Sequence, residues 1–149
     1  MLDGGACAVG VESTIIDCTG ESPRVLRPGA ISAAMIEEST GLSIQNSEQV
    51  EIRVSGSLEN HYAPAAKVFL CETPTAGQGF IAHANIETPP GVIRLASPHD
   101  DEEFARVLYS ALREADAQGI SEVVVMQPIG IGIAVAIRDR LARAANSRR

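Results

Sequence analysis

Strand-like and helix-like segments alternate through the second half of the chain, and this alternation constrains the fold more than any other feature. After an acidic first turn, apolar residues recur at helical spacing: Phe104, Val107, Leu108, Ala111, Leu112 and Ala115. Gly119 ends this helix, residues 122–126 have the composition of a buried strand, and a last helix follows from about 132 to 145. Three more strand candidates, separated by Gly and Pro turns, come earlier: residues 67–71, 79–83 and 92–96. This order predicts a right-handed strand–helix–strand crossover and an α/β fold with a Rossmann-like, partly parallel sheet and flanking helices.

The first part of the chain has short apolar runs broken by Gly and Pro. Residues 11–18 have strand composition, 19–23 form a turn, and 24–27 make a second short strand, so together they predict a β-hairpin. Ser32 can then cap a short helix that stops at Gly41. One hairpin and one short helix leave an apolar face uncovered. We therefore expect several apolar side chains here to lack most of their cover: Val11, Ile15, Ile16, Val25 and Leu26.

A polar stretch at residues 45–64, interrupted by the strand-like 50–54, separates these two parts and is typical of an interdomain connection. We divide the chain accordingly into a first region at 1–43, a linker at 44–66 and a C-terminal domain at 67–149.

The composition narrows the classes of function. A chain of 149 residues with 45% hydrophobic residues can build a core, and its net charge of −7 argues against direct tRNA or DNA binding, which relies on clustered Lys and Arg. Small-molecule substrates fit better. No apolar run approaches the roughly 20 residues that span a bilayer, so we expect a cytoplasmic protein without a membrane partner. Cys7, Cys18 and Cys71 are too widely spaced to suggest a disulfide framework or a zinc site, and we expect small buried side chains.

Four residues are candidates for a site. Ser13 lies beside a carboxylate and a second hydroxyl in Val-Glu-Ser-Thr, and Arg27 precedes Pro-Gly, where a guanidinium could bind phosphate oxygens. His61 and Tyr62 form the only adjacent His-aromatic pair in the sequence. Taken alone, each has an ordinary structural interpretation: a half-exposed strand, a surface arginine closing a hairpin, and loop packing.

Longer motifs around these residues resemble a known family. Residues 10–17 and 23–32 resemble the closing motif of the YrdC-like domain of the Sua5/YrdC/YwlC family of L-threonylcarbamoyl-AMP synthases. Residues 57–64 are similar to the family's linker, and the rest is similar to its C-terminal Sua5 domain. Because residues 1–5 resemble a late part of the first domain, the resemblance implies that 1–43 is a remnant of the YrdC-like domain and that most of the catalytic domain is absent.

The resemblance also implies an activity. The family joins L-threonine, bicarbonate and ATP into threonylcarbamoyl-AMP and pyrophosphate, with Mg²⁺, for the t6A modification of tRNA. On this basis Ser13 would hold L-threonine, Arg27 would contact ATP, and His61 and Tyr62 would lie on a linker that closes over the site. The resemblance identifies no catalytic residue or metal ligand in this chain, so the isolated chain is predicted to be an inactive part of a nucleotidyltransferase.

Other motifs favour structural roles. Residues 130–132 resemble the start of a dinucleotide fingerprint, but Val135 stands where its third glycine should be, so no NAD or FAD site is predicted. The acidic run 100–103 suits a helix N-terminus. His83 is expected at a strand edge and His99 in a solvated loop. The charged residues of the last helix are expected to form a solvated face: Arg138, Asp139, Arg140 and Arg143.

Two functions from other classes remain open. The chain could be a non-catalytic module that binds a nucleotide or a partner protein, or an autonomous RNA-binding protein, against which its acidity speaks. Self-association through an exposed sheet edge is a further expectation for the first region.

Overall fold

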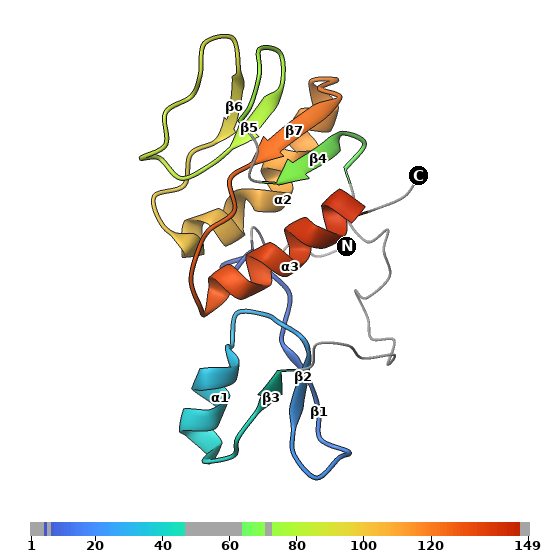
Figure 1. Cartoon of the computed structure of the whole chain (residues 1–149), viewed down its shortest axis with the longest axis vertical. Helices are drawn as coiled ribbons and strands as arrows, with labels where there is room; N and C mark the ends of the chain where they lie inside the picture. Colours follow the sequence, from blue (N-terminus) through green and yellow to red (C-terminus); the bar gives the residue numbers. More distant parts are fainter. Residues whose placement is uncertain (1–4, 6, 47–63, 71–72, 147–149) are drawn as a thin grey trace.

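The computed structural model describes residues 5, 7–46, 64–70 and 73–146, and it contains two sheets of different size. A small sheet with one helix lies at one end of the molecule and a larger sheet with two helices at the other (Figure 1). The linker residues expected to close over the site, His61 and Tyr62, and the strand-like 50–54 lie outside the described residues.

The larger sheet is entirely parallel. Its strands stand in the order β4-β7-β5-β6, which is not their order in the sequence. They span the following residues: Lys67–Leu70 (β4), Gly79–Ile81 (β5), Ile93–Ala96 (β6) and Glu122–Val125 (β7). Each falls within a predicted strand, and the predicted βαβ crossover runs from β6 through a helix to β7.

Both helices of this unit pack on the same face of the sheet. They are α2 (Asp101–Ala117) and α3 (Ile133–Asn146), and α2 begins with the side chain of Asp100 accepting the N–H of Glu103 at 2.7 Å. One buried cluster joins inward-facing residues of the sheet and of both helices: Val68, Ile81, Val123, Val125, Phe104, Leu108, Ile137 and Leu141. The apolar faces that the sequence predicts for the sheet and for the two helices therefore pack against one another in one core. No described helix is long and apolar enough to cross a membrane.

The opposite face of the sheet is covered by a loop instead of a helix. Phe80 and Val124 are buried there against residues of the β5–β6 connection. Arg94 holds this connection in place, with its guanidinium 4.9 Å from the Phe80 ring centroid. The same side chain donates at 2.7 to 3.0 Å to four backbone carbonyl oxygens, those of Ala82, His83, Ile86 and Ala96. Burial lowers the pKa of Arg94 below its ordinary value.

The small unit contains the predicted hairpin and helix. β1 (Ile15–Asp17) pairs antiparallel with β2 (Arg24–Arg27), and α1 spans Ala33–Thr40. α1 starts at the predicted cap, Ser32, and ends at the predicted stop, Gly41, in the left-handed conformation.

Two details of this unit differ from the sequence-based expectation. The first strand is shorter than 11–18, because residues 11–14 leave the sheet to pack elsewhere. In addition, β3 (Gln45–Asn46) pairs in parallel with β2 within the stretch assigned to the linker. The boundaries of the three proposed domains stay a prediction.

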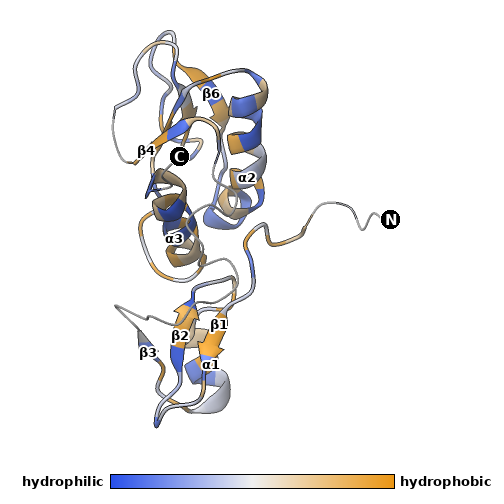
Figure 2. Ribbon diagram, turned by 90° about the vertical axis from the view of Figure 1, so that its right-hand side faces the viewer, coloured by the Kyte–Doolittle hydropathy of each residue, from blue (hydrophilic) through white to orange (hydrophobic). Residues whose placement is uncertain are grey.

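The small unit buries few apolar side chains. No residue of α1 is buried, and Ile31, Met35 and Leu42 are each more than half exposed. Figure 2 shows apolar segments on β1 and β2, with α1 beside them. The expected lack of cover for the hairpin side chains was wrong: Val11 is only 7% exposed and belongs to the core of the larger unit, and Ile15, Ile16, Val25 and Leu26 are each partly buried.

The expectation for the cysteines was wrong where it can be examined. Cys7 and Cys18 are exposed free thiols, and Cys71 lies outside the described residues. Cys7 sits in an irregular segment, where hydrogen bonds from the backbone of Gly10 and Val9 lower its pKa. Cys18 follows the last residue of β1 at the hairpin turn, which has no core to enter.

Candidate functional site

Two of the four predicted site residues are in direct contact. The Arg27 guanidinium donates from Nη2 to Ser13 Oγ at 3.2 Å and to the Ser13 carbonyl oxygen at 2.9 Å, and its Nε donates to the same carbonyl at 3.1 Å. Arg27 is only 7% exposed, whereas Ser13 is exposed. A surface arginine was the ordinary expectation for this position, and its burial against Ser13 replaces that interpretation.

The backbone after Arg27 lies against the backbone of the Ser13 motif. A Cβ atom added to Gly29 would stand 2.4 Å from the Glu12 carbonyl oxygen and 2.4 Å from the Thr14 nitrogen, which is far inside van der Waals contact. The Thr14 hydroxyl donates to the carbonyl oxygen of Ile31. The segment 12–14 is therefore held along its length by the segment 27–31, and only glycine permits this approach at position 29.

The other end of β1 is fixed by a carboxylate. Asp17 accepts hydrogen bonds from the Thr19 hydroxyl at 2.6 Å, the Thr19 N–H at 2.9 Å and Arg24 Nε at 2.9 Å. These donors, the Thr19 hydroxyl first, lower the pKa of Asp17 to about 2. Arg24 also forms an ion pair with Asp17 at 2.7 Å, so its guanidinium contributes to the structure of the hairpin.

The residues just before Ser13 are seated on the larger unit. Gly10 has a φ of +80°, and a Cβ atom there would lie 2.2 Å from the carbonyl oxygen of Ala105 in α2. Val11 follows it into the core shared by the sheet, α2 and α3.

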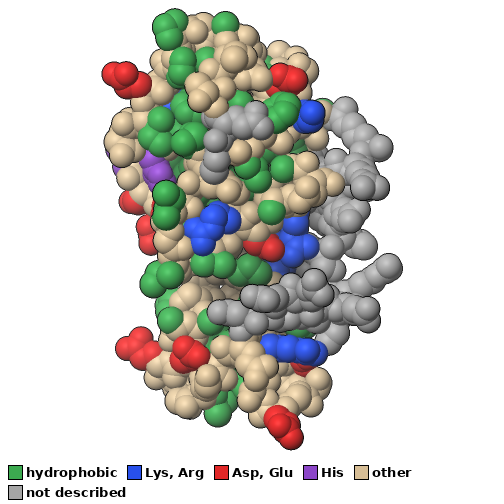
Figure 3. Space-filling view, in the orientation of Figure 1, with side chains coloured by type: hydrophobic (Ala, Val, Ile, Leu, Met, Phe, Trp, Pro, Cys, Tyr) green, Lys and Arg blue, Asp and Glu red, His purple; other side chains and the backbone are tan. Residues whose placement is uncertain are grey.

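Glu12 adds a charged contact between this segment and the larger unit. Its carboxylate forms an ion pair with Arg140 of α3 and accepts a long hydrogen bond of 3.4 Å from the Tyr109 hydroxyl of α2. Arg140 is 5% exposed, so its expected place on a solvated face was wrong. Asp139 and Arg143 stay closer to that expectation, since they pair with each other at 3.0 Å on a half-buried surface. Figure 3 shows basic and acidic side chains gathered near the junction of the two units.

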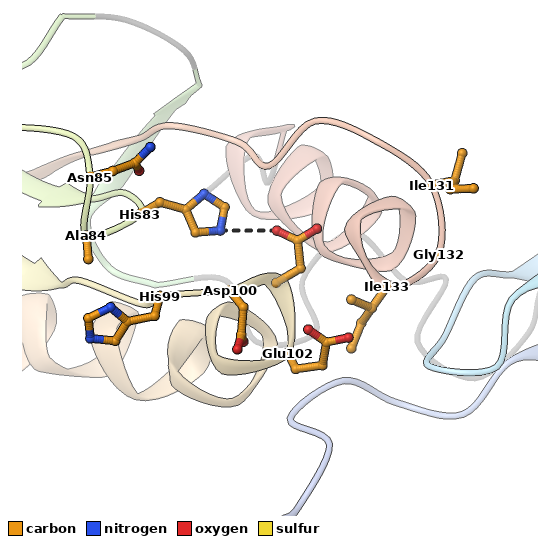
Figure 4. A pocket seen from close by; sticks show the side chains of 10 residues that line it. His83, Ala84, Asn85, His99, Asp100, Glu102, Ile131, Gly132 and Ile133 are labelled. Carbon is orange, nitrogen blue, oxygen red and sulfur yellow. Dashed lines mark ion pairs between the residues drawn. The ribbon is translucent and has the colours of Figure 1, made fainter.

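A separate pocket opens at the carboxyl edge of the parallel sheet, with a volume of about 730 Å³ (Figure 4). The loops after β5, β6 and β7 and the first residues of α2 and α3 line it: His83, Ala84, Asn85, His99, Asp100, Asp101, Glu102, Ile131, Gly132 and Ile133. His83 Nε2 lies 3.1 Å from Asp101 Oδ1, and the His83 ring meets the Phe104 ring edge-on at 5.3 Å between centroids. Asp101 thus fixes the orientation of the imidazole at the pocket wall.

Sequence reasoning assigned only structural roles to residues of this pocket: the acidic run 100–103 at a helix N-terminus, His83 at a strand edge and His99 in a solvated loop. The available signal was positional, because loops at the carboxyl ends of parallel strands converge and commonly bind ligands. Part of the acidic run is used locally, since Asp100 caps α2 and Glu103 accepts the N–H of His99 at 2.7 Å. The remaining carboxylates and the two imidazoles offer hydrogen bonds to a small polar molecule.

Among the residues that the structure describes, no three His, Cys, Asp or Glu side chains lie together in an arrangement that could hold a metal ion. Because Mg²⁺ commonly uses only one or two protein carboxylates beside substrate phosphates, the ligands of the expected Mg²⁺ stay unassigned.

Comparison with known proteins gives a consistent result. The family model described as threonylcarbamoyl-AMP synthase, C-terminal domain, matches residues 31–146. The threonylcarbamoyl-AMP synthase of Bacillus subtilis is 30% identical over 172 residues, covering 99% of this chain and 49% of the relative. The enzyme of the same name from Schizosaccharomyces pombe is 28% identical over 182 residues, covering 98% of this chain and 45% of the relative.

Solved structures agree with these matches. The crystal structure of P. abyssi Sua5 complexed with L-threonine superposes with a TM-score of 0.74 at 29% identity, covering 98% of this chain and 49% of that one. A variant of P. abyssi Sua5, with alanine in place of a histidine and the tyrosine that follows it, gives a TM-score of 0.71 at 26% identity. The chain spans about half the length of the relatives it matches, and the family model alone covers most of its residues. The chain belongs to the family defined by the C-terminal domain of threonylcarbamoyl-AMP synthase.

Proposed function

We propose that this chain is part of a threonylcarbamoyl-AMP synthase that joins L-threonine, bicarbonate and ATP in t6A biosynthesis in the cytoplasm. The observation that carries the proposal is the alignment of 98–99% of the chain with relatives of that name. In this reaction the threonine amine captures carbon dioxide as a carbamate, and a carbamate oxygen attacks the α-phosphate of ATP as pyrophosphate leaves. The enzyme is then a nucleotidyltransferase, and positive charge near the phosphates stabilises its transition state.

In this proposal Ser13 binds L-threonine and Arg27 contacts ATP. The Ser13 hydroxyl is accessible, and Arg27 already donates to it, so an amino acid at Ser13 and a phosphate at Arg27 would lie side by side. The L-threonine complex of P. abyssi Sua5 supports the choice of amino acid. A guanidinium can share its donors between the serine and a phosphate oxygen because it carries five N–H groups.

His61 and Tyr62 are proposed to act from the linker by closing over the site. The P. abyssi variant that replaces a histidine and the following tyrosine supports interest in such a pair, and His61-Tyr62 is the only adjacent His-Tyr in this sequence. Closure would exclude water from the mixed anhydride, which hydrolyses readily.

We expect the isolated chain not to turn over. The described residues bring together one arginine and one serine, and Mg²⁺, which the reaction uses at the triphosphate, has no ligands assigned here. Purified chain mixed with ATP, L-threonine, bicarbonate and Mg²⁺ should release no pyrophosphate above a no-protein control. Threonine-dependent release within tenfold of an ordinary turnover of about 1 per second would contradict this.

The site assignments are tested in a protein that also carries the first half of the relatives' length. Arg27→Ala should weaken ATP use by about 1.5 to 3 kcal/mol, the worth of a charge-assisted contact, and Ser13→Ala should mainly raise the threonine requirement. Arg24→Ala is the matched control, because Arg24 lies on the same strand but pairs with Asp17. Unchanged dependence on both substrates in the first two variants would refute the assignments.

The pocket at the sheet edge favours a second candidate, a binding module without catalysis. Its 730 Å³ and its place at the carboxyl ends of the strands suit a small ligand. Binding of a nucleotide or amino acid that shifts the signals of His83 and His99, and leaves Ser13 and Arg27 unchanged, would favour this function over the first.

A further inference from the structure

We propose that Arg140 is a positioning residue for the proposed threonine site. It belongs to the C-terminal domain, yet it holds the carboxylate of Glu12, which is the neighbour of Ser13 in the chain. The expected effect on threonine binding rests on the proposed function. The expected effect of Arg140 on the order of residues 12–14 can be tested without it.

The burial of Arg140 indicates that the pair is specific. Its side chain is 4% exposed and Glu12's is 26% exposed, whereas surface pairs keep both partners in water. Nη1 of Arg140 donates to Asp139 at 2.8 Å, while Nε and Nη2 are buried and make no hydrogen bond among the described residues, so the contact of Nε with Glu12 is an ion pair. Asp139 lies on the same helix and also pairs with Arg143. The Glu12 carboxylate is therefore the partner of Arg140 that comes from another part of the chain. A buried guanidinium that lost it would be poorly compensated.

The residues around Glu12 also restrain the position of Ser13. On one side, Gly10 rests on the α2 backbone and Val11 is buried in the core of the larger unit. On the other side, the Gly29 backbone presses against residues 12–14, and Arg27 holds the Ser13 carbonyl and hydroxyl. Ser13 is thus fixed between a hairpin that has little core of its own and a domain that has a large one. Arg140 and Glu12 form the charged link between the two.

The experiment compares Arg140→Met with Arg143→Met in the 149-residue chain. Arg143 is the matched control because it is on the same helix and pairs with Asp139 without touching Glu12. Backbone ¹⁵N order parameters at Glu12, Ser13 and Thr14 report the local effect, and an NMR titration with L-threonine reports binding. We expect Arg140→Met to lower the order parameters of these residues from about 0.85 to below about 0.7 while those of Val123–Val125 stay unchanged.

Threonine binding should weaken about tenfold in Arg140→Met and should not change in Arg143→Met. Glu12→Gln removes the negative charge of the same pair from its more exposed side, so it tests the proposal even if Arg140→Met fails to fold. The variant that combines Arg140→Met with Glu12→Gln should bind threonine no more weakly than either single variant, because each of these variants disrupts the same ion pair.

Each outcome decides a distinct point. If the native chain does not bind threonine but Arg140→Met and Glu12→Gln still loosen residues 12–14, the threonine site fails and the hold on this segment stands. If Arg140→Met and Glu12→Gln leave residues 12–14 as ordered as Arg143→Met does, Arg140 positions nothing and the inference is overturned. Equal loss of order throughout the chain in Glu12→Gln would show a purely structural role and would also overturn it.

Discussion

At the scale of single residues, the Asp17 carboxylate makes the hairpin sensitive to acid. Its pKa lies at about 2, below the ordinary 3.8, so the folded hairpin favours the ionised form. The resulting stabilisation is fully present above about pH 4 and is lost as the pH falls toward 2, when Asp17 takes up a proton. A titration of the Asp17 carboxyl carbon by NMR should give this low pKa, and the signals of β1 and β2 should change over the same range.

The cause of this shift gives a sharper test. Because the Thr19 hydroxyl is the largest cause of the shift, Thr19→Ala should raise the Asp17 pKa, although the Thr19 N–H and Arg24 still donate to the carboxylate. An unchanged pKa in Thr19→Ala would show that the remaining donors, and not the hydroxyl, keep the carboxylate ionised.

Arg94 should contribute strongly to the stability of the larger unit, because its side chain holds the β5–β6 connection against the sheet. Arg94→Met removes donors from four carbonyl oxygens and a cation from the Phe80 ring, so we expect a loss of about 2 to 4 kcal/mol in the free energy of unfolding. Urea unfolding measures it. Arg106→Met, on the exposed side of α2, should change stability by less than about 0.5 kcal/mol. Equal effects would mean that the β5–β6 connection covers the sheet without Arg94.

At the scale of elements, local sequence patterns predicted the strands of the larger sheet and the three helices. The four parallel strands follow from apolar composition between turn residues, α2 and α3 follow from the helical spacing of apolar residues, and α1 follows from its cap and stop residues. β3 could not be found in this way, because it has only two polar residues and is placed by a contact from Gln45 N–H to the Pro23 carbonyl oxygen at 2.9 Å. Residues 11–14 alternate like a strand, but their neighbours are the Gly29 backbone and the other unit, which no local pattern records.

The contact between the segments 12–14 and 27–31 predicts different effects at two glycines. Gly29→Ala should destabilise the hairpin by about 1 to 3 kcal/mol, because the added methyl group meets backbone atoms that cannot move away. Gly20→Ala should be nearly neutral, since the nearest atom to its added methyl group is 3.8 Å away. Neither position has a positive φ, so the comparison isolates crowding. Unfolding followed at Val25 and Leu26 measures both, and a neutral Gly29→Ala would refute the close approach.

At the scale of the whole molecule, stability should be unevenly distributed. The larger unit has a continuous core, whereas α1 has no buried residue. Amide hydrogen exchange should therefore be slow in β7 and the middle of α2 and fast in α1, with β1 and β2 between them, and limited proteolysis should leave a C-terminal fragment. Strong protection throughout residues 11–27 in a monomeric sample would contradict this, and would mean that the first region is complete as it stands. Protection that appears only as concentration rises would instead indicate self-association through the sheet edge.

The site was predictable where motifs are local and not where it is assembled from distant parts. Ser13 and Arg27 were selected from the sequence and are in contact, although their substrate roles stay predictions. Arg140 looked like one charge among several on a helix, because its partner lies more than 120 residues earlier. The pocket residues likewise gained their proximity only from the strand order, which places β7 between β4 and β5.

The carboxylates around the pocket also shape the electric field outside the molecule. Parallel sheets of this kind commonly receive phosphate-bearing ligands at their carboxyl edge, but here Asp100, Asp101 and Glu102 stand at that edge in a chain of net charge −7. A diffusing polyphosphate is therefore repelled there over about 10 Å at ordinary ionic strength, and over a longer range in dilute salt. Charge repulsion at this edge therefore favours an amino acid over a nucleotide as the ligand of the pocket in the second candidate function.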